Sequence, residues 1–273
     1  MHLAALFIHP VKSLRALAVA AAAIDPLGAV GDRRFIVVDP DGNFMTQRTV
    51  PRMALVGAFL DESTLTMRCR GFDDLRVRRS PDPAAPPIAV RVWKSEGLCA
   101  EDCGEEPAAW LSRVLQGPCR LARVGPAFMR QVTKKAARPG DLVGFADSCP
   151  FLVTSEESLG DLNRRIEVAG GVGVPMDRFR PNLVLAGCKP FEEDGWNRIR
   201  IGEIVFRSAG PCTRCVITVT DQLTGERGVE PLRALGAFRR DPAEPSAVNF
   251  GMNLVNETKS GVLRVGDPVA VLD

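Results

Sequence analysis

The sequence contains almost no histidine and no tyrosine. Of its 273 residues, only His2 and His9 are histidines. Imidazole is the general base of Ser-His-Asp hydrolysis and a frequent metal ligand, so both kinds of site have almost no raw material here. Without tyrosine, acid chemistry by a phenol is excluded. Cysteine, which occurs eight times, is then the most capable nucleophile and soft ligand in the chain.

The chain also lacks an excess of charge of either sign. Lysine and arginine number 35 and aspartate and glutamate 33, mixed along the sequence, which leaves a net charge of +2. No sequence-wide field therefore attracts nucleic acid, and any anion must be held by a local group of cations. The cysteines do not follow the regular spacing of a secreted disulfide framework. We therefore expect a reducing, cytoplasmic location.

No segment of the sequence is predicted to span a membrane. The nearest approach is LRALAVAAAAI, residues 14–24, which imitates the core of a signal peptide. Lys12 and Arg15 lie beside or within it, and the run is far shorter than the ~20 residues of a spanning helix. A strand or a pair of strands is expected there.

Turn residues divide most of the chain into short apolar runs. In RRFIVVDPDGNFMTQR, residues 33–48, the run FIVV is followed by Asp-Pro-Asp-Gly and a second arm, which predicts a hairpin. Similar runs continue to about residue 100 and return in the last third of the chain. A loop-like segment with prolines and a basic Lys134–Lys135 pair covers 125–150. We predict a mostly β protein (α+β) with a domain boundary at this loop, which separates residues 1–124 from 125–273.

A few helices interrupt the strands. Apolar residues recur at helical spacing in 105–117, where Gly-Pro ends the run. A second helix over 154–166 is predicted to begin at Thr154 as N-cap, with Glu157 three residues later. A third, short helix is expected within 230–240.

Cys212 and Cys215 form a Cys-x-x-Cys pair in GPCTRCVITVTD, residues 210–221. The alternating β-branched residues after Cys215 predict a strand with the pair at its head. A structural zinc site would need Cys99 and Cys103 as its other two ligands. A thioredoxin-like dithiol would need a helix start, where the thiol pKa falls.

Two further interpretations of the pair stay open at this point. Both cysteines can be small buried hydrophobes without chemical consequence. Alternatively, one thiolate ligates a soft, redox-active metal that an anionic cofactor holds, because thiolates suit such metals. Spacing alone does not rank these interpretations.

Nine motifs, spread over nearly the whole chain, resemble those of a known protein family. They are HPVKSL (9–14), GDRRFIVVDPDGNFMTQR (31–48), DCGEEPAAWL (102–111), FADSCPFLVTSEESLGDLN (145–163), FRPNLVLAG (179–187), PFEEDGW (190–196), IGE (201–203), PCTRC (211–215) and VGDP (265–268). Together they resemble the MOSC family, and more closely its members with a MOSC N-terminal β-barrel domain, the group of the mitochondrial amidoxime reducing components. The resemblance implies an N-terminal β-barrel domain packed against a MOSC β-barrel domain.

The resemblance also implies a molybdenum oxidoreductase that binds a molybdopterin-type cofactor. By position, Cys215 matches the metal-ligating thiolate. The residues that match contacts to the pterin, its phosphate or the motif around the thiolate are Lys12, Ser13, Arg33, Thr154, Ser155, Arg180, Asn182, Thr213 and Arg214. Asp221 is a candidate acid behind the metal, with a plain turn carboxylate as the alternative. Planar guanidinium groups and lysine bind phosphate by charge-assisted bonds, which suits this set.

The function implied is removal of an oxygen atom from N-hydroxylated substrates such as amidoximes and hydroxylamines. A separate electron donor, similar to a ferredoxin, cytochrome or flavin reductase, is expected, because no ferredoxin module is seen after Asp273. No nucleic acid partner and no membrane span are expected. The alternatives are a carrier of the molybdenum cofactor or a sulfur-handling MOSC protein without reductase turnover, and a nonenzymatic dithiol or zinc protein.

Overall fold

The chain folds mostly into strands with three helices, and the computed structural model describes all residues from 1 to 273. The prediction of a mostly β protein with a few helices is confirmed. The α-helices are α1 (Glu105–Leu115), α2 (Glu156–Val168) and α3 (Leu232–Phe238). The strands are β1 (His2–Ile8), β2 (Leu17–Val19), β3 (Ala21–Asp25), β4 (Gly28–Ala29), β5 (Phe35–Val38), β6 (Gly57–Leu60), β7 (Thr64–Arg68), β8 (Leu75–Arg78), β9 (Pro87–Val92), β10 (Ser95–Asp102), β11 (Arg120–Arg123), β12 (Phe151–Ser155), β13 (Leu183–Ala186), β14 (Arg198–Ile201), β15 (Ile204–Thr213), β16 (Asn249–Asn256), β17 (Val262–Arg264) and β18 (Val269–Val271).

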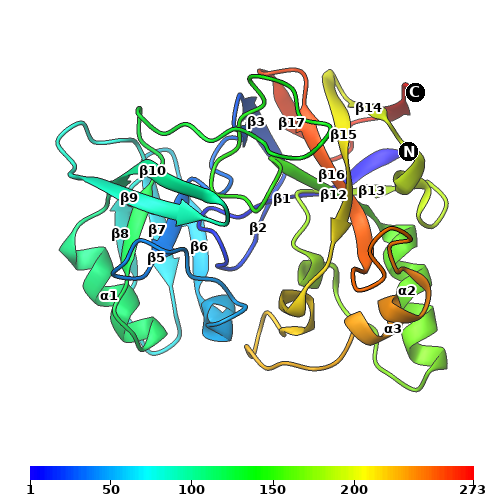
Figure 1. The fold of residues 1–273 in the computed structure, drawn as a ribbon, viewed down its shortest axis with the longest axis horizontal. Coiled ribbons are helices and arrows are strands. Elements are labelled where there is room, and N and C mark those ends of the chain that lie inside the picture. Colours follow the sequence, from blue (N-terminus) through cyan, green and yellow to red (C-terminus); the bar gives the residue numbers. More distant parts are fainter.

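The largest sheet joins the two ends of the chain. Its strand order is β18-β14-β15-β16-β12-β13-β1-β2, and only β12 and β13 run parallel. The first two strands therefore belong to the sheet that C-terminal strands build, and Figure 1 shows the N-terminus beside the C-terminus. Phe151 and Phe206 meet edge to face in its core, with ring centroids 5.1 Å apart. The strand or pair of strands predicted for 14–24 is present as β2 and β3, which belong to different sheets.

The other half of the molecule holds two smaller sheets with α1 against them (Figure 1). One sheet has the order β5-β11-β10-β9 and the other β6-β7-β8. The apolar face of α1 buries Trp110, Leu111 and Val114 in a core with residues of both sheets, as its helical spacing predicts. In the hairpin predicted over 33–48 the turn forms, but its second arm is reduced to a bridge between Val38 and Phe44.

The helix α2 begins one residue later than predicted. Ser155, not Thr154, is the N-cap, and its Oγ accepts a hydrogen bond from the backbone N–H of Ser158 at 3.1 Å. Thr154 still belongs to β12. The carboxylate of Glu157 accepts a bond from the backbone N–H of Gly187 instead of closing a capping box.

The prediction of a strand after Cys215 is wrong. Strand β15 ends at Thr213, before the second cysteine, and residues Val216–Val219 form a 3₁₀ turn. The carbonyl of Cys215 accepts hydrogen bonds from both the backbone N–H and the hydroxyl of Thr218, at 3.0 and 2.9 Å. These two bonds close the chain on itself, so it cannot extend along a sheet.

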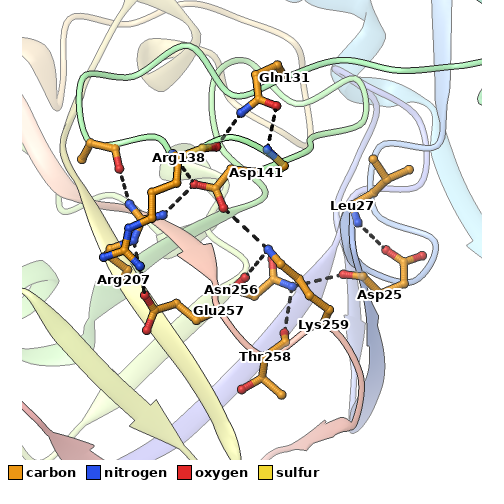
Figure 2. A network of polar contacts seen from close by, with 12 residues as sticks. Asp25, Leu27, Gln131, Arg138, Asp141, Arg207, Asn256, Glu257, Thr258 and Lys259 are labelled. Carbon is orange, nitrogen blue, oxygen red and sulfur yellow. Dashed lines mark hydrogen bonds and ion pairs between the residues drawn. The ribbon is translucent and has the colours of Figure 1, made fainter.

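A loop connects the two halves across the top of Figure 1. No helix or named strand occurs between Arg123 and Phe151. Figure 2 shows how the loop is held: Asp141 accepts a hydrogen bond from Arg207 of β15 at 2.6 Å, and Arg138 pairs with Glu257 at 2.9 Å. These ion pairs fix the loop against β15 and the end of β16. The domain boundary at residue 125 stays a prediction, since strands before it pair with C-terminal strands, β1 with β13 and β3 with β17.

Candidate functional site

A cavity of about 190 Å³ lies where the two halves meet. Eight of the residues named from the sequence line it: Lys12, Ser13, Arg33, Arg180, Asn182, Thr213, Arg214 and Cys215. They come from the segment after β1, the turn before β5, the segment before β13 and the end of β15. Residues far apart in the sequence therefore converge on one space.

Both cysteines of the pair face this cavity, together with Cys149, and all three are free thiols. Strand β15 is irregular before it ends, with shifts in register between Ser208 and Thr213. Such bulges redirect the side chains of a strand. The Sγ of Cys212 accepts a hydrogen bond from Arg214 at 2.8 Å. Cys215 is not bonded to Arg214, and its sulfur lies beside the guanidinium of Arg48.

Positive charge dominates the walls. The basic residues are Lys12, Arg33, Arg48, Lys134, Arg180 and Arg214, and the only acidic residue is Asp147. Burial and the neighbouring Arg33 lower the pKa of Arg180. Burial likewise lowers the pKa of Lys12 from 10.5 to about 8, although Asp147 opposes the shift. Six basic side chains against one acidic side chain in the lining leave a net positive charge, which favours a bound anion.

Asp147 bridges two of these cations. Its carboxylate contacts the Nζ of Lys12 and accepts a hydrogen bond from Arg48 at 3.0 Å. Desolvation raises the pKa of Asp147, but the two cations lower it by more, so it stays ionised. Burial lowers the pKa of Arg48, whereas Asp147 and the thiolate of Cys215 raise it, with a net increase. Arg48 thus places a positive charge beside Cys215.

Arg33 is fixed from behind by buried polar groups. Its guanidinium donates to Asp32 at 2.7 Å and to Asn182 at 2.9 Å, and both partners are buried. His9 packs beneath this cluster, and burial together with Arg33 and Arg180 lowers its pKa. The imidazole is therefore neutral, so it adds no charge to the cavity.

The backbone is strained at the cavity. Ser13, Arg33 and Arg180 have φ angles of 67°, 44° and 55°, in the left-handed region that favours glycine. Each costs on the order of 1 kcal/mol. Three of the six non-glycine residues with positive φ line this one space. Strain of this kind concentrates at functional sites, where it aims particular side chains.

Two aromatic side chains stand at the rim. Trp93, between β9 and β10, is 46% exposed, and its Nε1 donates to Asp147 at 3.3 Å. The guanidinium of Arg48 lies over its ring, 4.7 Å from the centroid. Phe44 packs against Trp93 with ring centroids 5.0 Å apart. The two rings thus contact both the cations of the cavity and each other at the rim.

The structure does not bring Thr154 and Ser155 to the cavity. Thr154 is buried and its hydroxyl contacts the sulfur of Met176. Ser155 is buried as well, and its hydroxyl is bonded to Ser158 and Glu193. The hydroxyl of Ser155 caps the start of α2, and the hydroxyl of Thr154, the last β12 residue before it, contacts Met176 in the core.

Asp221 also lies outside the cavity. Its carboxylate accepts bonds from the backbone N–H groups of Leu223 and Thr224 and from Arg178 at 2.8 Å. The bond from Leu223 is the largest cause that lowers its pKa. It is a turn carboxylate, the alternative considered from the sequence.

The sequence does not predict several lining residues as site residues, namely Arg48, Lys134, Asp147, Ser148, Cys149, Phe179 and Asn253. Most lie in turns or in the connecting loop, where no periodicity marks them. Arg48 and Asp147 do fall inside quoted motifs, which was their only signal. No group of three or more His, Cys, Asp or Glu side chains is arranged to hold a metal ion, so Cys99 and Cys103 do not complete a zinc site with Cys212 and Cys215.

Sequence comparisons show what the chain is similar to. Residues 1–118 match the MOSC N-terminal beta barrel domain and residues 140–270 the MOSC domain. Mitochondrial amidoxime-reducing component 1 is 36% identical in Mus musculus and 35% in Homo sapiens, each over 98% of this chain and 82% of the relative. Mitochondrial amidoxime reducing component 2 of Homo sapiens is 33% identical over 97% of this chain and 82% of the relative.

Proposed function

Because this chain belongs to the MOSC family and carries the domain pair of the amidoxime-reducing components, we propose that it is a molybdenum-dependent reductase of N-hydroxylated compounds. The single observation that carries the proposal is the cavity, where a free thiol opens onto six basic side chains. A soft ligand and an anion site in one space match a metal that an anionic cofactor carries.

The residues present fit a molybdopterin-type cofactor. Nη1 of Arg48 and Nε of Arg214 are buried without a hydrogen-bond partner in the protein. A buried donor left unpaired is costly, so both are suited to an acceptor on a ligand. Lys12, Arg33 and Arg180 would hold the phosphate and the pterin, and Cys215 would hold the metal.

The reaction proposed consumes two electrons and two protons. A hydroxylamine R–NHOH gives R–NH₂ and water, and an amidoxime gives the corresponding amidine and water. When bound, the molybdenum would supply the redox chemistry for cleavage of the N–O bond. An electron-donor protein supplies the electrons one at a time.

This chain's own residues would orient the reactants. Arg48 keeps a positive charge beside Cys215, where it would face the anionic ligand. Trp93 and Phe44 offer the small substrate a flat surface at the rim. Asp147 bridges Lys12 and Arg48, which fixes both cations in the cavity wall.

A reducing, cytoplasmic location is part of the proposal. All eight cysteines are free thiols, which suits such a compartment. No helix of the structure is long and apolar enough to cross a membrane.

The deciding experiment compares wild type with Cys215→Ser, both produced in a host that makes the molybdenum cofactor. Wild type should contain molybdenum and pterin near one per chain and should reduce benzamidoxime with dithionite-reduced methyl viologen. Cys215→Ser should lose this turnover, and Cys99→Ser, which changes an exposed thiol on β10, should retain it. Full turnover by Cys215→Ser with full molybdenum would show that the assignment is wrong.

The same experiment separates the alternatives. A cofactor carrier would contain molybdenum and pterin without turnover on any N-hydroxylated substrate. A dithiol protein would contain neither.

A further inference from the structure

A second concave surface lies next to the cavity, with a volume of about 730 Å³. We call it the arginine groove, and the residues that define it are Arg15, Arg52, Phe59, Arg68, Arg70 and Leu223. It is formed by the turn and strands around β6 and β7 together with the turn after Asp221. Gly225 of that turn lies against Leu55 and the carbonyl of Pro51, so the two halves of the chain meet here.

The charge of the groove is not balanced. Its walls contain four arginines and no carboxylate. Arg68 is paired with Asp74 at 2.8 Å, but Arg15, Arg52 and Arg70 form no ion pair. The guanidinium of Arg15 is held by the carbonyls of Ala54 and Gln222, which fix it without neutralising it. An acidic ligand is therefore the complement that this surface lacks.

Apolar side chains lie among these arginines. Phe59 is 40% exposed and Leu223 73% exposed. The guanidinium of Arg68 stacks on the ring of Phe59, 5.0 Å from its centroid. Arginine mixed with exposed aromatic and aliphatic groups is the composition of a protein interface, whereas a small anion needs no such apolar contacts. The groove thus fits an acidic protein surface.

The buried residues Gln222 and Gln47 connect the groove to the cavity. The backbone carbonyl of Gln222 accepts a bond from Arg15 in the groove, and its side chain contacts Arg180 in the cavity at 3.5 Å. Gln222 and the buried Gln47 also exchange two side-chain hydrogen bonds of 3.0 Å. Gln47 in turn bonds the carbonyl of Ser13 at 2.9 Å. A protein in the groove would therefore lie one layer of side chains from the cavity wall at Arg180 and Ser13.

We infer that the arginine groove is the docking surface for an acidic electron-donor protein. The inference rests on the proposed function, since only a reductase needs such a donor. It assigns the donor to a surface that shares no lining residue with the cavity, so that donor and substrate can be bound at the same time.

The test measures binding separately from turnover. The probe is a plant-type [2Fe–2S] ferredoxin, an acidic redox protein, titrated calorimetrically into the molybdenum-loaded wild type at low and at high salt. The groove variant is Arg52→Glu with Arg70→Glu. The control is Lys189→Glu with Arg200→Glu, which makes the same change in charge at two exposed residues outside the groove.

Wild type should bind the ferredoxin, and its dissociation constant should rise with salt. The groove variant should bind at least about tenfold more weakly at low salt, and the control within about twofold of wild type. Viologen-driven turnover should be the same in all three proteins. Absence of that turnover in wild type would count against the proposed function alone.

Three results would overturn the docking surface. They are equal ferredoxin binding by the groove variant and wild type, no salt-sensitive binding by wild type, and equal loss of binding by the control. Pyrophosphate that binds wild type but not the groove variant, without any ferredoxin binding, would identify a small-anion site instead.

Discussion

At the scale of single residues, Lys12 makes ligand binding dependent on pH. Its pKa of about 8 in the folded protein means that the ammonium begins to lose its proton above that pH. An anion needs the charged form, so affinity should fall above pH 8, by up to about tenfold per pH unit. Lys12→Arg keeps its charge and should remove this dependence. Retention of molybdenum and pterin after dialysis at pH 7 and pH 9.5 tests both proteins, and equal losses would contradict the role of Lys12.

Substitution of Asp147 should shift the pH dependence of ligand binding that Lys12 causes. Its carboxylate opposes the desolvation that lowers the pKa of Lys12. Asp147→Asn should therefore lower this pKa further and start the loss of cofactor below pH 8. The same dialysis series, extended to pH 6.5, provides the measurement. An onset unchanged from wild type would mean that Asp147 does not support the charge of Lys12.

The sequence predicts site residues well where they lie in ordered motifs. Lys12, Arg33 and Cys215 were named because they match a family pattern, and they do line the cavity. Thr154 and Ser155 sit in an equally clear motif but are used to start a helix. A motif indicates that a residue is functionally or structurally important. Whether that residue contacts a ligand or stabilises a nearby element depends on contacts that only the folded chain makes.

At the scale of elements, the start of α2 offers a prediction about stability. Ser155 caps the helix and its hydroxyl bonds the buried carboxyl of Glu193 at 3.2 Å. Ser155→Ala should lower the free energy of unfolding by about 1–3 kcal/mol, because both bonds are lost in a buried place. Urea denaturation measures this, with the exposed Ser63→Ala as control.

The same variant tests whether Ser155 contacts the cofactor. Its molybdenum content should equal that of wild type, because the hydroxyl lies outside the cavity. A protein of normal stability that has lost its molybdenum would reverse this conclusion.

Two elements show why sequence patterns fail near the site. The β-branched run after Cys215 alternates like a strand, yet contacts with Thr218 close it into a turn. Strand β16 was not predicted, because all its residues are buried and asparagines stand where apolar residues would mark a face. Asn253, for example, bonds the carbonyls of Gly210 and Pro211 beside the cysteine motif. Such asparagines donate hydrogen bonds to backbone carbonyls of the irregular neighbouring strand β15. No local sequence pattern predicts these contacts.

At the scale of the whole molecule, the first strands are needed by the C-terminal half. Strand β1 pairs with β13, and Leu3 and Leu6 are fully buried in the core of the large sheet. A fragment of residues 125–273 should therefore fail to fold alone, because it exposes the edge of β13 and loses part of its core. Dispersion of amide signals in a ¹H–¹⁵N NMR spectrum tests this. A dispersed spectrum of the fragment would show that the division at residue 125 separates two independent domains.

The left-handed backbone at Ser13, Arg33 and Arg180 leaves a mark that can be read in other sequences. Glycine at these positions would relieve strain, but it would remove the side chains that face the cavity. At these three positions, selection for a stable fold therefore favours glycine, whereas selection for anion binding favours the present side chains. A related chain that has abandoned the ligand is free to drift toward glycine there, whereas one that still uses it is not. We therefore expect positions 13, 33 and 180 to distinguish members that bind the ligand from those that keep only the architecture.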